Sequence, residues 1–121
     1  MRSILIVDDF QPLLELLKEI VLSVFGPEVE LLQARTAEEA LSKVKEDPAK
    51  VSIVITDNDH DILIESAGIE LLKFFRDKSP ATKRILISGK AERLDTSVAD
   101  VFLQKPFSVV ALATVLRGFS G

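Results

Sequence analysis

Residues 51–57 read VSIVITD, a short apolar run that stops at an aspartate. Runs of this length that are rich in β-branched residues are typical of strands. A strand that is apolar on both sides is typical of a parallel sheet with helices on both faces. Similar short runs occur at residues 4–7, 84–87 and 101–103, and residues 28–34 also have the pattern of a strand. The sequence therefore predicts five strands, the third of which ends at Asp57.

The segments between these runs carry apolar residues at helical spacing. A helix is expected between Pro12, which suits a first turn, and Gly26-Pro27, which stops it. Another follows Thr36-Ala37-Glu38-Glu39, which has capping-box spacing. Two more begin near Gly68 and near Ser108. Strands that alternate with helices predict an α/β fold, a single doubly wound domain over residues 1–121 with a five-stranded parallel sheet.

Composition narrows the classes of function. With 121 residues, 47% hydrophobic and 28% charged, the chain suits one globular domain. Cysteine is absent, which excludes disulfides and sulfur-ligated metals. No apolar run is long enough to span a membrane, and the first residues are not those of a signal peptide, so a cytoplasmic location is expected. The net charge of −4 and the lack of a basic cluster argue against direct binding of nucleic acid.

Polar residues stand where the predicted strands end. The first strand ends in Asp8-Asp9, the third in Asp57, the fourth in Ser88 and the fifth near Lys105. Ligands bind at the carboxyl ends of strands in sheets of this type. Two carboxylates about 4 Å apart repel by roughly 4 kcal/mol at an effective dielectric constant near 20, so a proton or a cation is needed there.

Mg²⁺ suits such a site because it prefers oxygen ligands and leaves positions open for phosphate oxygens. Lys105 could neutralise phosphate charge and the Ser88 hydroxyl could donate a hydrogen bond. The arrangement fits phosphoryl transfer with the Asp57 carboxylate as nucleophile. Taken singly, each residue has an ordinary explanation, since Asp8 and Asp9 could cap the following helix and Lys105 could be a surface lysine. Their joint placement favours the functional interpretation.

The chain resembles the receiver domain of two-component response regulators over essentially its whole length. The resemblance rests on ILIVDD at 4–9, the strand ending at Asp57, ILISG at 85–89 and FLQKPF at 102–107. It implies the flavodoxin-like (CheY-like) strand order 2-1-3-4-5. The 102–107 segment is also similar to receivers attached to hybrid histidine kinases.

The resemblance implies a role for each matching residue. Asp57 corresponds to the phosphoacceptor, and Asp8 and Asp9 to residues that hold Mg²⁺. Asp59 corresponds to the position whose backbone carbonyl completes the metal shell. Lys105 corresponds to the phosphate-binding lysine.

The resemblance also implies a conformational switch. Ser88 corresponds to the switch hydroxyl, and Phe102 to the switch aromatic that fills the space Ser88 leaves. We expect the Lys105–Pro106 peptide bond to be cis. The implied donor is a phosphohistidine on a sensor histidine kinase or a histidine phosphotransfer protein, with a downstream protein as reader. The chain would act as a switch rather than an enzyme, since it catalyses only its own phosphorylation and dephosphorylation.

Three features depart from the family pattern. The loop after Asp57 is enlarged and lacks the usual Met-Pro pair. The interval between Ser88 and the fifth strand leaves room for a shortened fourth helix of at most about two turns, or for no helix there. Asp59 and Lys90 occupy the positions that tune dephosphorylation in the family, and we expect them to pair across the pocket mouth.

Other interpretations remain open at this point. Asp57-Asn58-Asp59 is similar to the nucleophile motif of haloacid-dehalogenase-type phosphatases, although Asp61 stands where that family prefers Thr or Val. The same aspartates alternate as in a calcium loop, but Ile62 replaces the required Gly. The chain could also be a receiver-like binding module that is not phosphorylated. His60 has no second histidine with which to build a metal site.

Overall fold

The computed structural model describes residues 3–57, 67–89 and 96–120. The strands are β1 (Ser3–Val7), β2 (Glu30–Ala34), β3 (Val51–Asp57), β4 (Lys83–Ser88) and β5 (Val101–Gln104). The α-helices are α1 (Gln11–Phe25), α2 (Ala37–Val44), α3 (Ala67–Lys78) and α4 (Val109–Ser120). Two short 3₁₀ helices, η1 (Pro48–Lys50) and η3 (Thr96–Val98), complete the described elements.

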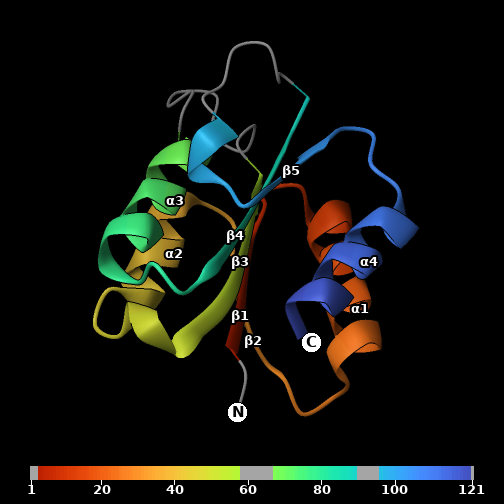
Figure 1. Ribbon diagram of the computed structural model, residues 1–121, viewed down its shortest axis with the longest axis horizontal. Coiled ribbons are helices and arrows are strands. Elements are labelled where there is room, and N and C mark those ends of the chain that lie inside the picture. Colours follow the sequence, from red (N-terminus) through yellow and green to blue (C-terminus); the bar gives the residue numbers. More distant parts are fainter. Residues whose placement is uncertain (1–2, 58–66, 90–95, 121) are drawn as a thin grey trace.

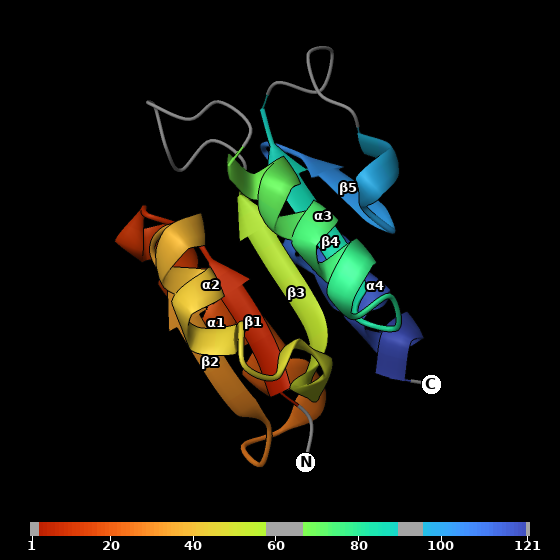
Figure 2. The same cartoon turned by 90° about the vertical axis from the view of Figure 1, so that its left-hand side faces the viewer.

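All five strands are parallel and lie in the order β2-β1-β3-β4-β5, which confirms the predicted sheet. Helices α1 and α4 cover one face, and α2 and α3 cover the other (Figure 1, Figure 2). The carboxyl ends of the strands therefore meet at one edge between the two helical layers.

The core has two layers because successive strand residues point to opposite faces. Ile4 and Ile6 of β1 pack with α1 and α4, whereas Leu5 and Val7 pack with α2 and α3. The three central strands are mostly buried, as their apolar runs predict; the exceptions are Ser52 of β3 and Lys83 and Arg84 at the start of β4. The edge strands β2 and β5 are mostly half-buried, so the expectation of covered strands holds only for the centre of the sheet.

Several boundaries differ from the sequence prediction. Strand β2 begins at Glu30 rather than Glu28, because the chain first turns at Gly26, whose φ of 86° favours glycine. Helix α4 continues past Gly118 to Ser120. Between β4 and β5, the described residues contain only the single turn of η3, and residues 90–95 lie outside the described part. Within the described ranges, no helix combines the length and the apolar character that a membrane span needs.

Candidate functional site

The register of the sheet brings the predicted site residues to one edge. Val7 pairs with Thr56, so Asp8 and Asp57 follow on neighbouring strands. Asp57 pairs with Ile87 on β4, one residue before Ser88. Ser88 pairs with Gln104 on β5, one residue before Lys105. Strand pairing therefore brings the backbones of Asp8, Asp57, Ser88 and Lys105 to the same edge of the sheet.

Lys105 and Asp57 form the central contact of the site. The Lys105 Nζ lies 2.6 Å from Asp57 Oδ2. The Asp57 side chain is only 3% exposed, whereas that of Lys105 is 31% exposed. A buried carboxylate needs such a partner because removing its charge from water is costly. The Lys105–Pro106 peptide bond is cis, as predicted from the sequence.

Asp8 is fully buried beside this pair. Its Oδ1 accepts a hydrogen bond of 2.9 Å from the Phe10 amide, but its Oδ2 is buried without a hydrogen-bond partner in the described part of the chain. Burial raises the pKa of Asp8 from 3.8 to about 7. The Phe10 amide opposes this rise, the charge of Asp57 adds to it and the charge of Lys105 reduces it.

The Asp8 carboxyl therefore requires either a proton or a cation. A buried carboxylate oxygen without a partner, next to a second carboxylate, is a donor set that fits a hard divalent cation such as Mg²⁺. Within residues 3–57, 67–89 and 96–120, no three His, Cys, Asp or Glu side chains form a complete metal-binding group. Asp59, the fourth predicted contributor, lies outside the described residues, as do His60 and Lys90.

Asp9 differs from Asp8 because its side chain is exposed. Neither aspartate caps α1. The N-cap position is Phe10, and no side chain bonds the first turn there. The alternative in which these aspartates serve as helix caps is therefore wrong.

Arg35 is a contributor to this edge that the sequence interpretation missed. It directly follows β2, and its Nη2 donates a hydrogen bond of 2.9 Å to the backbone carbonyl of Asp9. Its own amide donates to Glu39 Oε2 at 3.2 Å. The sequence did contain a signal for Arg35. It is a cation directly after β2, and β2 lies beside β1, the strand that Asp8 and Asp9 follow.

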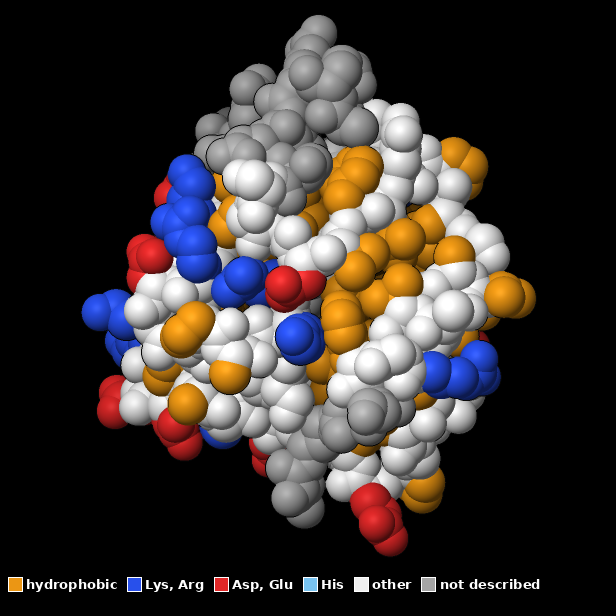
Figure 3. Space-filling view, in the orientation of Figure 1, with side chains coloured by type: hydrophobic (Ala, Val, Ile, Leu, Met, Phe, Trp, Pro, Cys, Tyr) orange, Lys and Arg blue, Asp and Glu red, His pale blue; other side chains and the backbone are white. Residues whose placement is uncertain are grey.

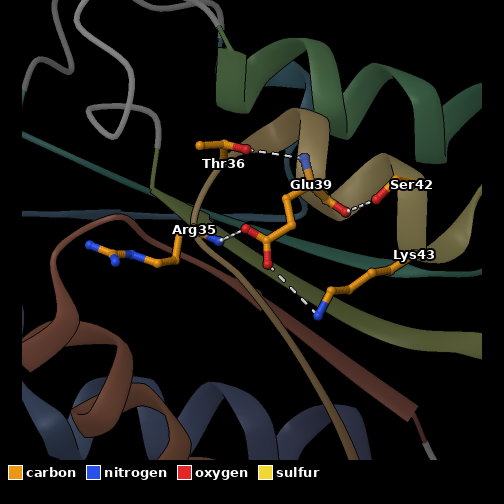
Figure 4. A network of polar contacts seen from close by, with 5 residues as sticks. All are labelled: Arg35, Thr36, Glu39, Ser42 and Lys43. Atoms are coloured by element: carbon orange, nitrogen blue, oxygen red, sulfur yellow. Dashed lines mark hydrogen bonds and ion pairs between the residues drawn. The ribbon is translucent and has the colours of Figure 1, made fainter.

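The predicted capping box at Thr36 is present in modified form (Figure 4). Thr36 is the N-cap of α2, and its hydroxyl accepts a hydrogen bond of 3.0 Å from the Glu39 amide. The Glu39 carboxylate bonds the amide of Arg35 rather than that of the cap residue, and its other oxygen lies 3.8 Å from the Lys43 ammonium. This network fixes the backbone at Arg35.

The predicted switch residues lie on adjacent strands. Ser88 is fully buried at the end of β4. Phe102 pairs in register with Leu86 and is half-buried, packed against the core layer that contains α2 and α3. Ser88 thus ends β4, and Phe102 lies on the neighbouring strand β5, two register positions before the pair Ser88–Gln104.

An apolar groove of about 590 Å³ lies beside Lys105. It is lined by Phe10, Pro12, Leu13, Leu16, Lys105, Pro106 and Phe107. Phe10 is 62% exposed, which is unusual for an aromatic side chain. Hydrophobic side chains also gather on the molecular face over β5 and α4 (Figure 3).

Residues 4–117 match the family model described as the response regulator receiver domain. The chain belongs to this family. A search of curated protein sequences returns no match. Membership makes the receiver a signalling domain of two-component systems.

Solved structures share the receiver fold. A response regulator receiver domain protein from Clostridium thermocellum is 23% identical, with a TM-score of 0.78, over 98% of this chain and 94% of that one. The non-phosphorylated receiver domain of HemR from Leptospira biflexa is 22% identical, with a TM-score of 0.79, over 98% and 94% of the two chains. An uncharacterized protein from Neptuniibacter caesariensis is 24% identical, with a TM-score of 0.80, over 98% and 86%. At these identities the likeness concerns the fold.

Proposed function

We propose that this receiver is a phosphorylation switch in which Asp57 accepts a phosphoryl group in a Mg²⁺-dependent reaction. The observation that carries the proposal is the contact of 2.6 Å between Lys105 Nζ and Asp57 Oδ2 beside the buried Asp8 carboxyl. A nucleophilic carboxylate, an ammonium group and an unsatisfied carboxylate oxygen are the groups that phosphoryl transfer needs.

The transfer step follows from these groups. A carboxylate oxygen of Asp57 attacks the phosphorus, and a P–O bond forms as the P–N bond to a donor histidine breaks. The electron pair of the broken bond leaves with the imidazole nitrogen, which takes a proton. The product is an acyl phosphate on Asp57, and the ammonium group of Lys105 shifts its interaction to the new phosphoryl oxygens.

Asp8, Asp9 and Asp57, together with the backbone carbonyl of Asp59, are the groups we expect to hold Mg²⁺. The bound ion would supply positive charge against the phosphoryl oxygens. The chain's own contribution is to hold Asp8 and Asp57 in the dry interior, where an added positive charge has the greatest effect.

The change is passed on through Ser88 and Phe102. The hydroxyl of Ser88 would move towards the phosphoryl group, and Phe102 would fill the space that it leaves. Reversing a 1:99 equilibrium requires about 5.5 kcal/mol of differential stabilisation. Charge-assisted hydrogen bonds from Lys105 and Ser88, with the bound cation, are a sufficient source.

Asp59 and Lys90 are proposed to pair at the pocket mouth and to restrict the water that hydrolyses the acyl phosphate. Both lie outside the described residues, so the pairing rests on the family resemblance. The half-life of phosphorylated Asp57 should shorten in Lys90→Ala. An unchanged half-life would contradict the pairing.

The donor is proposed to be a phosphohistidine on a sensor histidine kinase or a histidine phosphotransfer protein in the cytoplasm. A donor protein must reach Asp57 at the carboxyl edge of the sheet. The apolar groove that includes Phe10 and Lys105 provides contact area beside that edge. The downstream partner is proposed to be a protein that binds the surface around Phe102. We do not expect direct binding to nucleic acid or to a membrane.

The test is the intact mass of the protein after incubation with acetyl phosphate or phosphoramidate, with and without Mg²⁺. Phosphoramidate carries a P–N bond and so represents the phosphohistidine. One added phosphoryl group is expected for wild type with Mg²⁺ and none for Asp57→Asn. Asp77→Asn, which changes an exposed carboxylate on α3, is the matched control and should behave as wild type.

The failures of this test separate the alternatives. Absence of an adduct together with bound Mg²⁺ and turnover of a generic phosphatase substrate would favour the haloacid-dehalogenase-type chemistry. Absence of both adduct and Mg²⁺ binding would favour a receiver-like binding module that is not phosphorylated.

A further inference from the structure

We propose that Arg35 is a positioning residue for the cation site, because it holds the β1–α1 loop on which Asp8 and Asp9 lie. The inference rests on the proposed function, since it concerns the same Mg²⁺ site. Arg35 directly follows β2, whereas the other residues of the site lie at the ends of β1, β3, β4 and β5.

In the described part of the chain, few hydrogen bonds hold the β1–α1 loop, residues 8–10. The Asp8 amide donates to the Ala34 carbonyl at 3.1 Å, and Asp8 Oδ1 accepts from the Phe10 amide. Helix α1 begins behind Phe10 without a side-chain cap. Among the described residues, no side-chain hydrogen bond holds the exposed Asp9 carboxylate, so we infer that the loop backbone sets its direction.

Arg35 forms a hydrogen bond to this loop at Asp9. Its Nη2 donates to the Asp9 carbonyl at 2.9 Å across the gap between two loops that are separate in sequence. The side chain extends away from the polar network of α2 and towards the β1–α1 loop (Figure 4). The guanidinium makes no ion pair with a carboxylate in the described part of the chain, so its contact is with the loop backbone.

Arg35 is itself held in place from α2. The bond from its amide to Glu39 Oε2 and the bond from the Glu39 amide to Thr36 fix the backbone from which the long side chain starts. A side chain with a fixed origin loses less conformational freedom when it forms a hydrogen bond. The α2 network thus supports the Asp9 contact indirectly.

Positioning and charge predict opposite effects on Mg²⁺ affinity. A guanidinium near an acidic pocket repels a second cation, so if Arg35 acted only through its charge, removing it would tighten Mg²⁺ binding. If Arg35 acts by holding the loop, removing it would weaken binding because the Asp9 carboxylate must then be ordered when the ion binds. The sign of the change decides between the two roles.

The experiment is a calorimetric titration of Mg²⁺ into wild type, Arg35→Ala, Arg35→Lys and the control Lys45→Ala. Lys45 is an exposed cation beyond the end of α2, so its removal alters net charge equally. We expect Arg35→Ala to weaken Mg²⁺ binding by about three- to tenfold, the range for one lost hydrogen bond. Arg35→Lys should recover part of the affinity because it retains a charged donor, and Lys45→Ala should leave the affinity unchanged.

Amide hydrogen exchange in the metal-free protein provides a readout that does not depend on the ion. The amides of Leu13 and Leu14, which both donate to the Phe10 carbonyl, should exchange faster in Arg35→Ala than in wild type, with equal melting temperatures. Unchanged or tighter Mg²⁺ binding by Arg35→Ala would overturn the inference and leave the proposed function intact. Failure of wild type to bind Mg²⁺ would overturn both.

Discussion

The backbone amide of Lys105 donates a hydrogen bond of 3.0 Å to the backbone carbonyl of Ser88. This bond closes the carboxyl edge between β4 and β5, directly after their last paired residues. The residue that neutralises Asp57 and the residue proposed to respond to the phosphoryl group are thus tied through their backbones. Displacement of either strand end would be transmitted to the other.

Replacement of Lys105 by Ala should destabilise the metal-free protein by about 2 kcal/mol, because Asp57 then stays buried beside Asp8 without its ammonium partner. Urea unfolding at neutral pH measures the difference. Lys45→Ala is the control and should change stability by less than about 0.5 kcal/mol. Equal stability of wild type and Lys105→Ala would show that the ion pair does not compensate the burial of Asp57.

The raised pKa of Asp8 should make stability depend on pH. The folded protein holds this proton up to about pH 7 and the unfolded chain loses it near 3.8, so folding stability falls as the pH rises through this range. From pH 5 to 8, metal-free wild type should lose on the order of 2 kcal/mol more than Asp8→Asn, whose side chain does not titrate. Parallel pH profiles for the two proteins would contradict the assignment.

If the proposed Mg²⁺ site exists, Mg²⁺ should stabilise the folded protein, because the cation would satisfy Asp8 Oδ2 only when β1 and β3 are paired. At a concentration ten times its Kd, the free energy of unfolding should rise by about 1.4 kcal/mol. Thermal unfolding followed by circular dichroism, with chelator or with Mg²⁺, measures the shift. The shift should be lost in Asp8→Asn and retained in Asp77→Asn.

Val98 should be important for stability although it lies in a single 3₁₀ turn. It is 2% exposed and belongs to the core layer of α2 and α3, which it closes between β4 and β5. Val98→Ala should cost about 1–3 kcal/mol, as for other buried truncations. The same substitution at Val110, which is 71% exposed, should have almost no effect. Similar losses of stability in Val98→Ala and Val110→Ala would mean that the packing of Val98 against the core does not stabilise the protein.

Thr36→Ala should destabilise the protein by about 1 kcal/mol, because the first turn of α2 loses its N-cap acceptor. Thr114→Ala provides the matched control. Thr114 is exposed within α4 and its hydroxyl donates to the Val110 carbonyl of its own helix, so alanine there should be neutral or slightly stabilising. Denaturant unfolding of the two variants measures the contrast, and equal effects would argue against the cap.

The central sheet was predictable because β1, β3 and β4 are apolar on both faces and end in polar residues. The same pattern located Asp8, Asp57, Ser88 and Lys105, since strand ends converge whenever the strands are parallel. The strand order came from the family resemblance. The short interval after Ser88 limited the β4–β5 helix to about two turns, and the described part of that connection holds only the 3₁₀ turn η3, while residues 90–95 lie outside the described residues.

The different environments of Asp8 and Asp9 could not be read from the sequence. The two residues are chemically identical neighbours, and only the path of the loop decides that one is buried and the other exposed. Arg35 was missed for a similar reason. Its contact with Asp9 joins two loops that meet only because β2 lies beside β1 at the edge of the sheet.

The order in which the ribosome makes these residues has a consequence for the switch. Asp57 ends β3, whereas Asp8 and Lys105 directly follow β1 and β5, and every pairing of the parallel sheet joins distant parts of the chain. Such non-local contacts form slowly and late in folding. A nascent chain that has not yet released Lys105 from the ribosomal tunnel would bring the two acidic residues together without their ammonium group. If Asp57 accepts a phosphoryl group as proposed, newly made protein should be unable to receive it until β5 has emerged and joined the sheet.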